Sequence, residues 1–367
     1  MYGSSASLGV AQSLGFLMIG LSGTDLTERE RQQLMHPAVA GVVLFRRNYE
    51  TPEQLRALTS HIHGLRHPRL LVSVDHEGGR VQRFKTQGFT PLPAMRALGD
   101  CYDQHPQESL HLAYSLGWLL AAELLACGVD FSFAPVLDLD YGNSSVIGDR
   151  AFHHNPHVVG LLAEQVMNGM QAAGMSCVAK HFPGHGFVVP DTHIDMAKDC
   201  RPLASLVGAD MQPFKHLIRH YCGAIMAAHV IYNEVDDLPA GLSSIWLKQL
   251  LREQCGFNGA IISDDLGMQA VASLASGGQL ANDFHQAGCD LVLLCNDQTQ
   301  IESALTDHHA YEADALQESR LIRLHGKPKQ AVAGLKALHK TGQWLSVMKH
   351  LAKAGLVTFD TSVNAYE

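Results

Sequence analysis

The stretch AKHFPGHGFVVPDTH, residues 179–193, concentrates side chains that donate hydrogen bonds, accept them or titrate. Asp191 and His193 lie two residues apart, so in an extended or turning segment their side chains point the same way. The carboxylate can then hold one imidazole nitrogen and leave the other free. A carboxylate partner also favours the imidazolium and would raise the pKa of the histidine toward neutral pH. This pair therefore has the build of a general acid/base.

Two adjacent aspartates, Asp264 and Asp265, follow an apolar run in the stretch ISDDLGM. Neighbouring residues on a strand face opposite ways, so we expect only one of the two carboxylates to enter a site at the strand end. A carboxylate there suits a nucleophile or an electrostatic stabiliser. An aspartate after a strand also commonly caps the next helix. We assign the site to Asp264 and the capping role to Asp265 or its neighbours.

A third polar group lies in VDHEGGRVQRF, residues 74–84. Asp75 ends an apolar run, two glycines then allow a tight turn, and Arg80 and Arg83 follow. A carboxylate beside a guanidinium at the rim of a pocket can hold several hydroxyl groups at once. The alternative is an ordinary ion pair on the surface.

The histidines of the first stretch do not have the spacing of a metal site. His181 and His185 are four residues apart, but Pro183 between them argues against a helix that presents both. His61 and His63 lie in a predicted helix, where residues two apart do not share a face. A phosphate cradle needs glycines that lead to a lysine at a helix start, and here the lysine comes first. We therefore expect no metal and no cofactor.

Short apolar runs recur along the chain and alternate with amphipathic stretches of helical length. The runs that predict strands buried on both faces are residues 14–21, 41–45, 70–75, 129–138, 176–181, 223–230, 259–265 and 290–297. Capping residues predict helices at 51–65, 155–174 and 243–256. Alternating strands and helices indicate a parallel sheet, and eight such strands fit a closed barrel.

The fold class that we predict is α/β, a single (β/α)8 TIM-type barrel with a C-terminal helical extension. A doubly wound open sheet is the competing fold, but the first run leads into GLSGTDL, which lacks the glycine fingerprint of that fold. Polar residues stand where the predicted strands end, as a barrel site requires: Asp75, Asp138, Lys180, His181, His229, Asp264 and Asn296. We expect one catalytic domain over residues 1–367, with the barrel at about 14–300 and one or two C-terminal helices within about 301–355.

Composition narrows the class of protein further. The formal net charge of −9 gives no basic footprint for nucleic acid or for an anionic membrane. The N-terminal apolar run is too short to span a bilayer and lacks the basic region of a signal peptide. The 8 cysteines form no CxxC pair and are typical of free thiols in a reducing compartment. We expect a cytoplasmic, soluble monomer that binds neither nucleic acid nor membrane.

Seven stretches in a fixed order resemble glycoside hydrolase family 3, and within it the bacterial cytoplasmic β-N-acetylglucosaminidases of peptidoglycan recycling. They are LFRRNY (44–49), VDHEGGRVQRF (74–84), FAPVLDL (133–139), IGDRAF (147–152), AKHFPGHGFVVPDTH (179–193), AAHVIY (227–232) and ISDDLGM (262–268). The sequence KHFPGHG followed by Asp-Ser/Thr-His is the most specific of these signals. The chain departs from that branch at His76, where Gln is usual, at Thr192, where Ser is usual, and in lacking a proline soon after His193.

The resemblance implies roles for single residues. Asp264 resembles the catalytic nucleophile, His193 the general acid/base and Asp191 the residue that orients it. The residues that resemble the sugar-binding set are Asp75, Arg83, Arg150, Lys180 and His181. His185 is left with a structural role in the loop, whose glycines Gly184 and Gly186 would let His193 swing toward the substrate.

The implied reaction is retaining hydrolysis through a covalent glycosyl-enzyme. The implied substrate is a muropeptide, N-acetylglucosaminyl-anhydro-N-acetylmuramic acid with or without its peptide. Alternatives remain open at this point. They are substrate-assisted attack by the 2-acetamido group, a phosphorylase, a broader β-glycosidase of the same family, and an inactive sugar-binding sensor.

Overall fold

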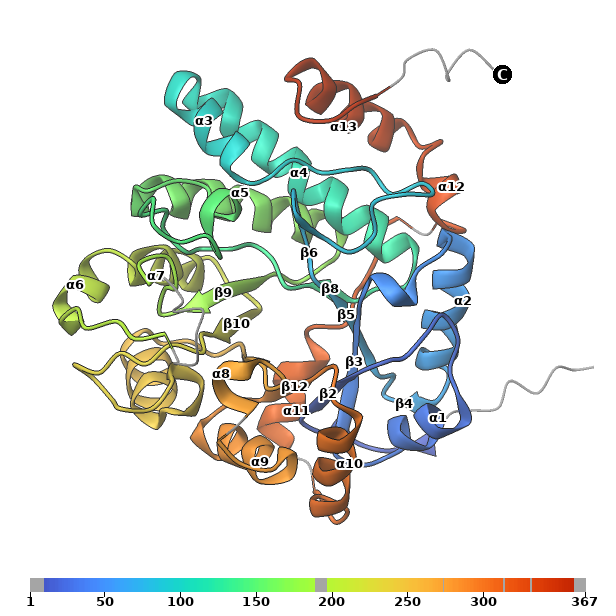
Figure 1. The fold of residues 1–367 in the computed structure, drawn as a ribbon. Coiled ribbons are helices and arrows are strands. Elements are labelled where there is room, and N and C mark those ends of the chain that lie inside the picture. Colours follow the sequence, from blue (N-terminus) through green and yellow to red (C-terminus); the bar gives the residue numbers. More distant parts are fainter. Residues whose placement is uncertain (1–9, 189–196, 273, 313, 331, 360–367) are drawn as a thin grey trace, which may run out of the picture.

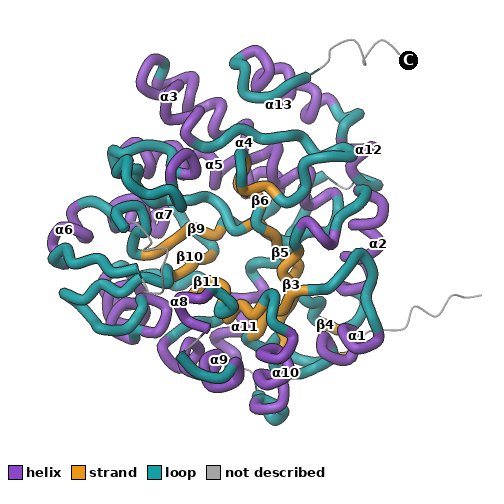
Figure 2. Tube along the Cα trace, viewed as in Figure 1, coloured by secondary structure: helices purple, strands orange, loops and turns teal. Residues whose placement is uncertain are grey.

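The structure is a computed structural model that describes residues 10–188, 197–272, 274–312, 314–330 and 332–359. Its centre is a parallel sheet of eight strands, drawn in orange in Figure 2 with the helices outside it. The strands are β2 (Leu17–Gly20), β3 (Val39–Leu44), β5 (Leu71–Val74), β8 (Phe131–Ser132), β9 (Val178–Phe182), β10 (Ala224–Ala227), β11 (Ala260–Asp265) and β12 (Leu291–Leu294). Each of them overlaps one of the predicted runs, and every described pairing between them is parallel.

Closure of the barrel takes place between the segment after β8 and strand β9. Val136 forms a parallel bridge with Lys180. The backbone N–H of Leu137 donates to the carbonyl of Lys180 at 2.6 Å, and the N–H of Lys180 donates to the carbonyl of Pro135 at 3.2 Å. The sheet is thus nearly closed into a barrel, and the predicted fold class is confirmed.

Helices surround the barrel and follow its strands in turn (Figure 1). They are α1 (Glu28–Leu34), α2 (Pro52–His63), α5 (Pro156–Ala173), α6 (Leu203–Gly208), α7 (Met211–Arg219), η4 (Ile245–Gln254), α8 (Gln269–Ala272), α9 (Gly277–Ala287) and α10 (Gln298–Asp307). Two predicted caps are confirmed, because Thr51 accepts from the N–H of Gln54 at 3.1 Å and Asn155 accepts from the N–H of His157 at 3.0 Å. The third predicted helix is η4, whose backbone has π-type hydrogen bonding.

Two helices that the sequence patterns did not predict, α3 (Arg96–Gln104) and α4 (Pro106–Ala126), lie between β7 and β8. By length and apolarity α4 is the one helix in the described part of the chain that could cross a membrane. However, 83% of its apolar window is buried inside the protein. A helix apolar all round and buried in this way is typical of a protein core.

The C-terminal extension consists of α11 (Ala315–Ile322), which contacts β11, and of α12 (Leu335–Leu338) and α13 (Gly342–Lys353), which pack on α4. The long helical segment predicted at the C-terminus is therefore broken into two helices, and Thr341 caps the second of them. The buried carboxylate of Glu123 on α4 accepts from the indole N–H of Trp344 at 3.1 Å and from the hydroxyl of Thr90 at 2.7 Å. These bonds tie the extension to the barrel.

Short elements complete the fold and place parts of the site. A parallel pair joins β1 (Val10–Ala11) to β4 (Arg66–His67), and a small hairpin pairs β6 (His76–Gly78) with β7 (Val81–Gln82). Single turns of 3-10 helix are η1 (Arg46–Asn48), η2 (Gly148–Arg150) and η3 (Ala240–Leu242). The hairpin and η2 matter most for function, because they carry charged side chains to the carboxyl ends of the strands.

Candidate active site

A pocket of about 360 Å³ opens at the carboxyl ends of the barrel strands. Its lining comes from segments far apart in the sequence: Val43, Phe45, Asp75, Val81, Arg83, Phe133, Val146, Arg150, Lys180, His181, His185, Met226, Asp264, Asp265, Met268, Leu293, Cys295 and Asn296. All five residues predicted to bind the sugar line this pocket together with Asp264. Five of the polar residues expected at strand ends line the pocket, whereas Asp138 and His229 do not; the five are Asp75, Lys180, His181, Asp264 and Asn296.

Lys180 lies at the centre of a buried charge network. Its ammonium Nζ is 2.9 Å from Oδ1 of Asp75 and 2.6 Å from Oε1 of Glu77, and its side chain is only 3% exposed. Burial would lower the pKa of Lys180, but the two carboxylates outweigh it and raise that pKa above its ordinary value. Lys180 is therefore charged and fixed in position.

Two guanidinium groups complete this network. Nη2 of Arg83 is 3.1 Å from Oδ2 of Asp75, and Arg150 binds Glu77 with two N–H groups, at 2.9 and 2.8 Å. Burial would raise the pKa of Asp75, but Lys180 and Arg83 hold that pKa at about 2. All these groups are therefore ionised at neutral pH. Removing one buried partner would leave an uncompensated charge at a cost of about 3–5 kcal/mol.

His181 is oriented by a buried aspartate. Its Nδ1 is 2.7 Å from Oδ2 of Asp138, whose Oδ1 also accepts from the backbone N–H of His185 at 2.7 Å. Burial would raise the pKa of Asp138, but His181 and these hydrogen bonds hold it at about 2. Because that carboxylate is ionised, Nδ1 of His181 must donate the proton in this bond. Nε2 is then left for a ligand in the pocket.

Asp264 lies near the end of β11 and faces the same pocket. Burial would raise its pKa, but the imidazoles of His229 and His181, the backbone N–H of Asp265 and the charge of Lys180 together lower it below its ordinary value. The N–H of Asp265 donates to Oδ1 of Asp264 at 2.8 Å. The carboxylate is therefore ionised and held in place, as a nucleophile requires.

Asp265 also lines the pocket, so the expectation that only one of the two aspartates would reach it is wrong. The reason is that its carboxylate bends toward the loops, where Oδ1 accepts from the N–H groups of Gly267 and Cys295, both at 3.1 Å. Burial raises the pKa of Asp265. We expected Asp265 or its neighbours to cap the next helix, but the described bonds of its carboxylate hold a turn at Gly267 and the residue that follows β12.

His229 and His185 contribute imidazoles that the resemblance did not assign to the site. Nε2 of His229 is 3.2 Å from the carbonyl oxygen of Asp265, and a carbonyl only accepts, so this nitrogen carries the proton. Burial lowers the pKa of both histidines, which keeps them neutral. His185 also lines the pocket, so its role is not confined to the loop. Its backbone N–H donates to Oδ1 of Asp138, which holds the residue at the pocket.

The proposed acid/base pair, Asp191 and His193, lies outside the described residues. The described chain on either side is held firmly. On the near side Gly184 has φ +141°, and an added Cβ would lie 2.6 Å from Asp210. A Cβ on Gly186 would lie 1.8 Å from the carbonyl oxygen of Leu139. Close packing therefore explains both glycines, which we had interpreted as points of flexibility.

Arg201 connects the two sides of that segment. Its guanidinium lies 4.0 Å from the ring centre of Phe187 on the near side and pairs with Asp199 on the far side at 2.7 Å. It also pairs with Asp210 at 2.9 Å. On the far side the N–H of Asp199 donates to the carbonyl of Ile231 at 2.8 Å. The ends of the segment that carries Asp191 and His193 are thus anchored to each other and to the barrel.

Glu77 was not predicted from the sequence, although it stands in DHEGG, two residues after Asp75. The carboxylate lies behind the pocket lining, 3% exposed, and holds both Lys180 and Arg150. His76, which departs from the usual pattern, is buried among the rings of Phe84 and Phe89. Burial lowers the pKa of His76 to about 3, so it is a neutral core residue and does not line the pocket.

The ionised state of Asp138 predicts how the Asp138→Asn variant responds to acid. The pKa is depressed from 3.8 to about 2, so the carboxylate stabilises the fold above about pH 4, and that part is lost as the pH falls toward 2. The contribution of the ionised Asp138 carboxylate to the free energy of unfolding is about 2 kcal/mol. In thermal melts we expect the variant to have a lower Tm at pH 7 and the gap to shrink below pH 4. A gap that stays constant with pH would contradict the assignment.

Asp140→Asn is the matched control for this experiment. Its carboxylate is 27% exposed and pairs with Arg96 nearer the surface. We expect a smaller loss of Tm at pH 7, since ion pairs nearer the surface contribute less.

A nearly closed barrel with an ionised, half-buried carboxylate and a preformed charge network at its strand ends has features of a glycoside hydrolase site. Residues 12–321 match the profile of the Glycosyl hydrolase family 3 N terminal domain. The chain belongs to this family, and the resemblance seen in the sequence motifs is confirmed.

Individual relatives agree over nearly the whole chain. A protein of Hydrogenovibrio crunogenus named beta-hexosaminidase is 52% identical over 94% of this chain and 95% of its own length. The crystal structure of native NagZ from Neisseria gonorrhoeae has a TM-score of 0.88 and 41% identity, and covers 95% of this chain and 100% of its own. The same NagZ in complex with N-trifluoroacetyl-D-glucosamine has a TM-score of 0.87, with the same identity and coverage.

Proposed function

We propose that this glycoside hydrolase is a β-N-acetylhexosaminidase that removes terminal β-linked N-acetylglucosamine from muropeptides with retention of configuration. The observation that carries the proposal is the ionised carboxylate of Asp264, which faces a pocket already lined by the charge network of Asp75 and Lys180. The names of the curated relatives support the hexosaminidase activity. The N-acylglucosamine bound to the related NagZ supports the sugar.

In the first step of the proposed mechanism, Asp264 attacks the anomeric carbon and the bond to the leaving oxygen breaks. His193, as imidazolium, gives its proton to that oxygen, so the aglycone leaves as a neutral alcohol. Asp191 holds the other nitrogen of His193 and stabilises the charged form. The carboxylate of Asp264 is half-buried in the pocket, and the backbone N–H of Asp265 holds it in position.

In the second step, neutral His193 takes a proton from a water molecule, which attacks the glycosyl-enzyme and frees Asp264. The histidine returns to the imidazolium, so protons balance over one turnover. Most retaining glycosidases use two carboxyl groups about 5 Å apart for these roles. Here a histidine takes the place of one of the two carboxyl groups. The imidazole of His193 is protonated near neutral pH only because the neighbouring Asp191 stabilises its charged form.

The sugar hydroxyls are proposed to bind to Asp75, Arg83, Arg150, Lys180 and His181. The hydrogen bonds leave each of them partly free for this task. Lys180 has three N–H donors and uses two on Asp75 and Glu77, so one remains. Nδ1 of His181 faces Asp138, and among the described residues Nε2 has no hydrogen-bond partner. The proposed sugar-binding side chains are therefore preorganised, and little rearrangement is needed when the sugar binds.

A phosphorylase is less well supported than a hydrolase. Phosphate would need positive charge in the pocket that is not already neutralised. Arg83, Arg150 and Lys180, the cations of the described pocket lining, each pair with a carboxylate. We further propose that the protein is a cytoplasmic monomer and that its substrate is a soluble muropeptide. These parts of the proposal rest on the family resemblance.

Product analysis tests the proposed function directly. Incubation with N-acetylglucosaminyl-anhydro-N-acetylmuramic acid, with and without its peptide, is expected to release N-acetylglucosamine as the β-anomer. Adding phosphate should change neither the rate nor the products. Release of N-acetylglucosamine 1-phosphate would replace the hydrolase proposal by a phosphorylase. Failure to cleave any aryl N-acetylglucosaminide would leave the sugar-binding sensor as the better interpretation.

A further inference from the structure

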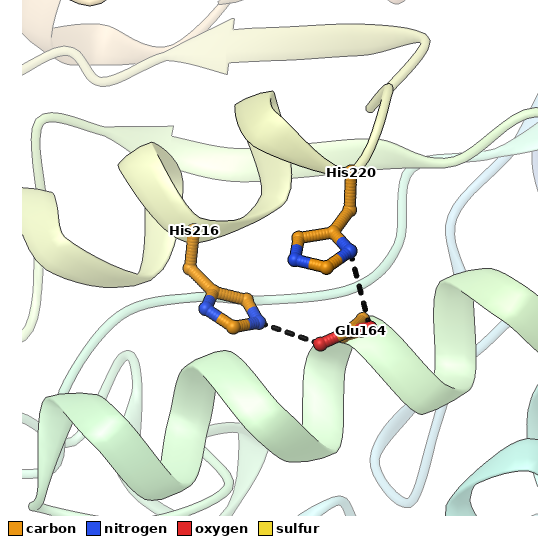
Figure 3. Close-up of side chains that lie close together, drawn as sticks. All are labelled: Glu164, His216 and His220. Atoms are coloured by element: carbon orange, nitrogen blue, oxygen red, sulfur yellow. Dashed lines mark hydrogen bonds and ion pairs between the residues drawn. The ribbon is translucent and has the colours of Figure 1, made fainter.

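Three side chains on the outside of the barrel converge at a place that the proposed reaction does not use. His216 lies on α7 and His220 directly follows that helix, four residues later, so both rings lie on the same face. Glu164 projects toward them from α5 (Figure 3). The histidine pair stands in the sequence KHLIRHYC, residues 215–222.

The distances between these groups are close to those of a metal site. Nε2 of His216 is 2.6 Å from Oε2 of Glu164, and Nδ1 of His220 is 3.2 Å from Oε1 (Figure 3). One ligand atom from each residue lies within 4.8 Å of the others. Four-coordinate zinc, with bonds of about 2.1 Å, separates its ligands by about 3.4 Å. Small rotations of the side chains bring the three atoms to that spacing.

We propose that Glu164, His216 and His220 form a binding site for a borderline divalent transition-metal ion, with Zn²⁺ as the ion of first choice. Two imidazoles and one carboxylate suit this class, whereas Ca²⁺ and Mg²⁺ prefer shells made of oxygen. The side chains of His216 and His220 are 28% and 45% exposed, so solvent reaches the cluster and water supplies the fourth ligand.

The backbone favours this convergence. An added Cβ at Gly160 on α5 would lie 3.3 Å from the ring of His216, a tight contact, so glycine lets that ring approach the helix without shifting. Lys215 and Arg219 line the groove beside His216, and their charges oppose a cation. We therefore expect binding in the micromolar range and not the tight binding of a fully enclosed structural site.

The position of the cluster indicates what the ion does. In chain order α5 precedes and α7 follows β9, the strand that carries Lys180 and His181. An ion held by both helices would clamp them together beside that strand, so zinc should raise the Tm of the protein. It takes no part in the hydrolysis, because none of its three ligands lines the active-site pocket.

Zinc binding by the full-length, reduced protein tests the proposal. Equilibrium dialysis against micromolar ZnCl₂, with metal analysis, should show that the His216→Ala/His220→Ala variant binds one ion fewer than wild type. Its rise in Tm with zinc should also disappear. Glu164→Gln keeps a side chain of the same size but loses the anionic ligand, and we expect it to weaken binding at least tenfold. Hydrolase activity without zinc should be unchanged in each.

His111→Ala/His309→Ala is the matched control, because it removes two histidines that are exposed in the structure and lie outside the cluster. It should bind as many ions as wild type. This control separates a loss of ions at the cluster from a general effect of removing exposed histidines. An anomalous-scattering peak between Glu164 and His216 in a zinc-soaked crystal would locate the ion. An unchanged ion count in the cluster variant, or zinc peaks only elsewhere, would overturn the proposal.

Discussion

Asp264→Asn is expected to lower kcat on an aryl N-acetylglucosaminide by at least about 10⁴-fold, or about 5.4 kcal/mol in activation free energy. The amide keeps the shape of the side chain and can still accept from the N–H of Asp265. It cannot form the glycosyl ester, so the first step has no nucleophile. Initial rates with a nitrophenyl glycoside measure the loss, and a melt at neutral pH confirms that the variant is folded.

Asp265→Asn is the matched control, since the two carboxylates are adjacent and both line the pocket. Its carboxylate accepts from Gly267 and Cys295, so the variant should lose activity through a disturbed turn but keep the covalent step. A fluorosugar inactivator should label Asp264 in wild type and also in Asp265→Asn. Labelling at Asp265 would reverse the assignment.

The same labelling experiment separates covalent from substrate-assisted catalysis. If the 2-acetamido group attacked the anomeric carbon, no sugar would become attached to the protein and Asp264 would only stabilise the charge. The product that Asp264→Ala forms with azide is a second test of the role of Asp264 as nucleophile. A single displacement inverts the centre, so the product should be the α-glycosyl azide. Formation of the β-azide in this variant would contradict a direct role of Asp264 as nucleophile.

The barrel strands were predictable because a parallel strand buried on both faces is a continuous apolar run. The run 129–138 shows where this reasoning ends. Only Phe131–Ser132 pairs as a strand there, and Val136 adds a single bridge. Pro135 lies between them and has no N–H to donate, which interrupts the ladder. The helix α4 was missed for a different reason: it is apolar all round, so it has no amphipathic period to detect.

The site was predictable where a residue type at a strand end carried the signal, as for Asp75 and Lys180. It was not predictable where a partner is recognised only after folding. Glu77 and Arg150 are 73 residues apart in the chain, and no spacing rule connects them. In the same way, Glu164 reveals itself as a partner of His216 only because α5 packs against α7. A sequence pattern thus finds the groups that line the pocket more readily than the groups that hold them in place.

His193→Ala should slow cleavage of the natural disaccharide by about 10³-fold, within the range of general acid catalysis. A sugar hydroxyl is a poor leaving group and needs a proton in the transition state. A 2,4-dinitrophenolate leaves without one, so the first step with that glycoside should change by less than about tenfold. Water then attacks slowly without a base, and a burst of dinitrophenol should precede a slow steady state. Stopped-flow absorbance resolves the two phases.

Two comparisons make this test specific to the acid/base role. Azide needs no base, so it should speed the slow step of His193→Ala and give the β-glycosyl azide, the product of two inversions. His185→Ala removes another imidazole of the pocket, and we expect it to slow both substrates by the same factor because His185 supports the binding site and transfers no proton. If His193→Ala also slowed both substrates equally, His193 would not be the acid. The dependence on the leaving group, rather than the size of the loss, therefore decides its role.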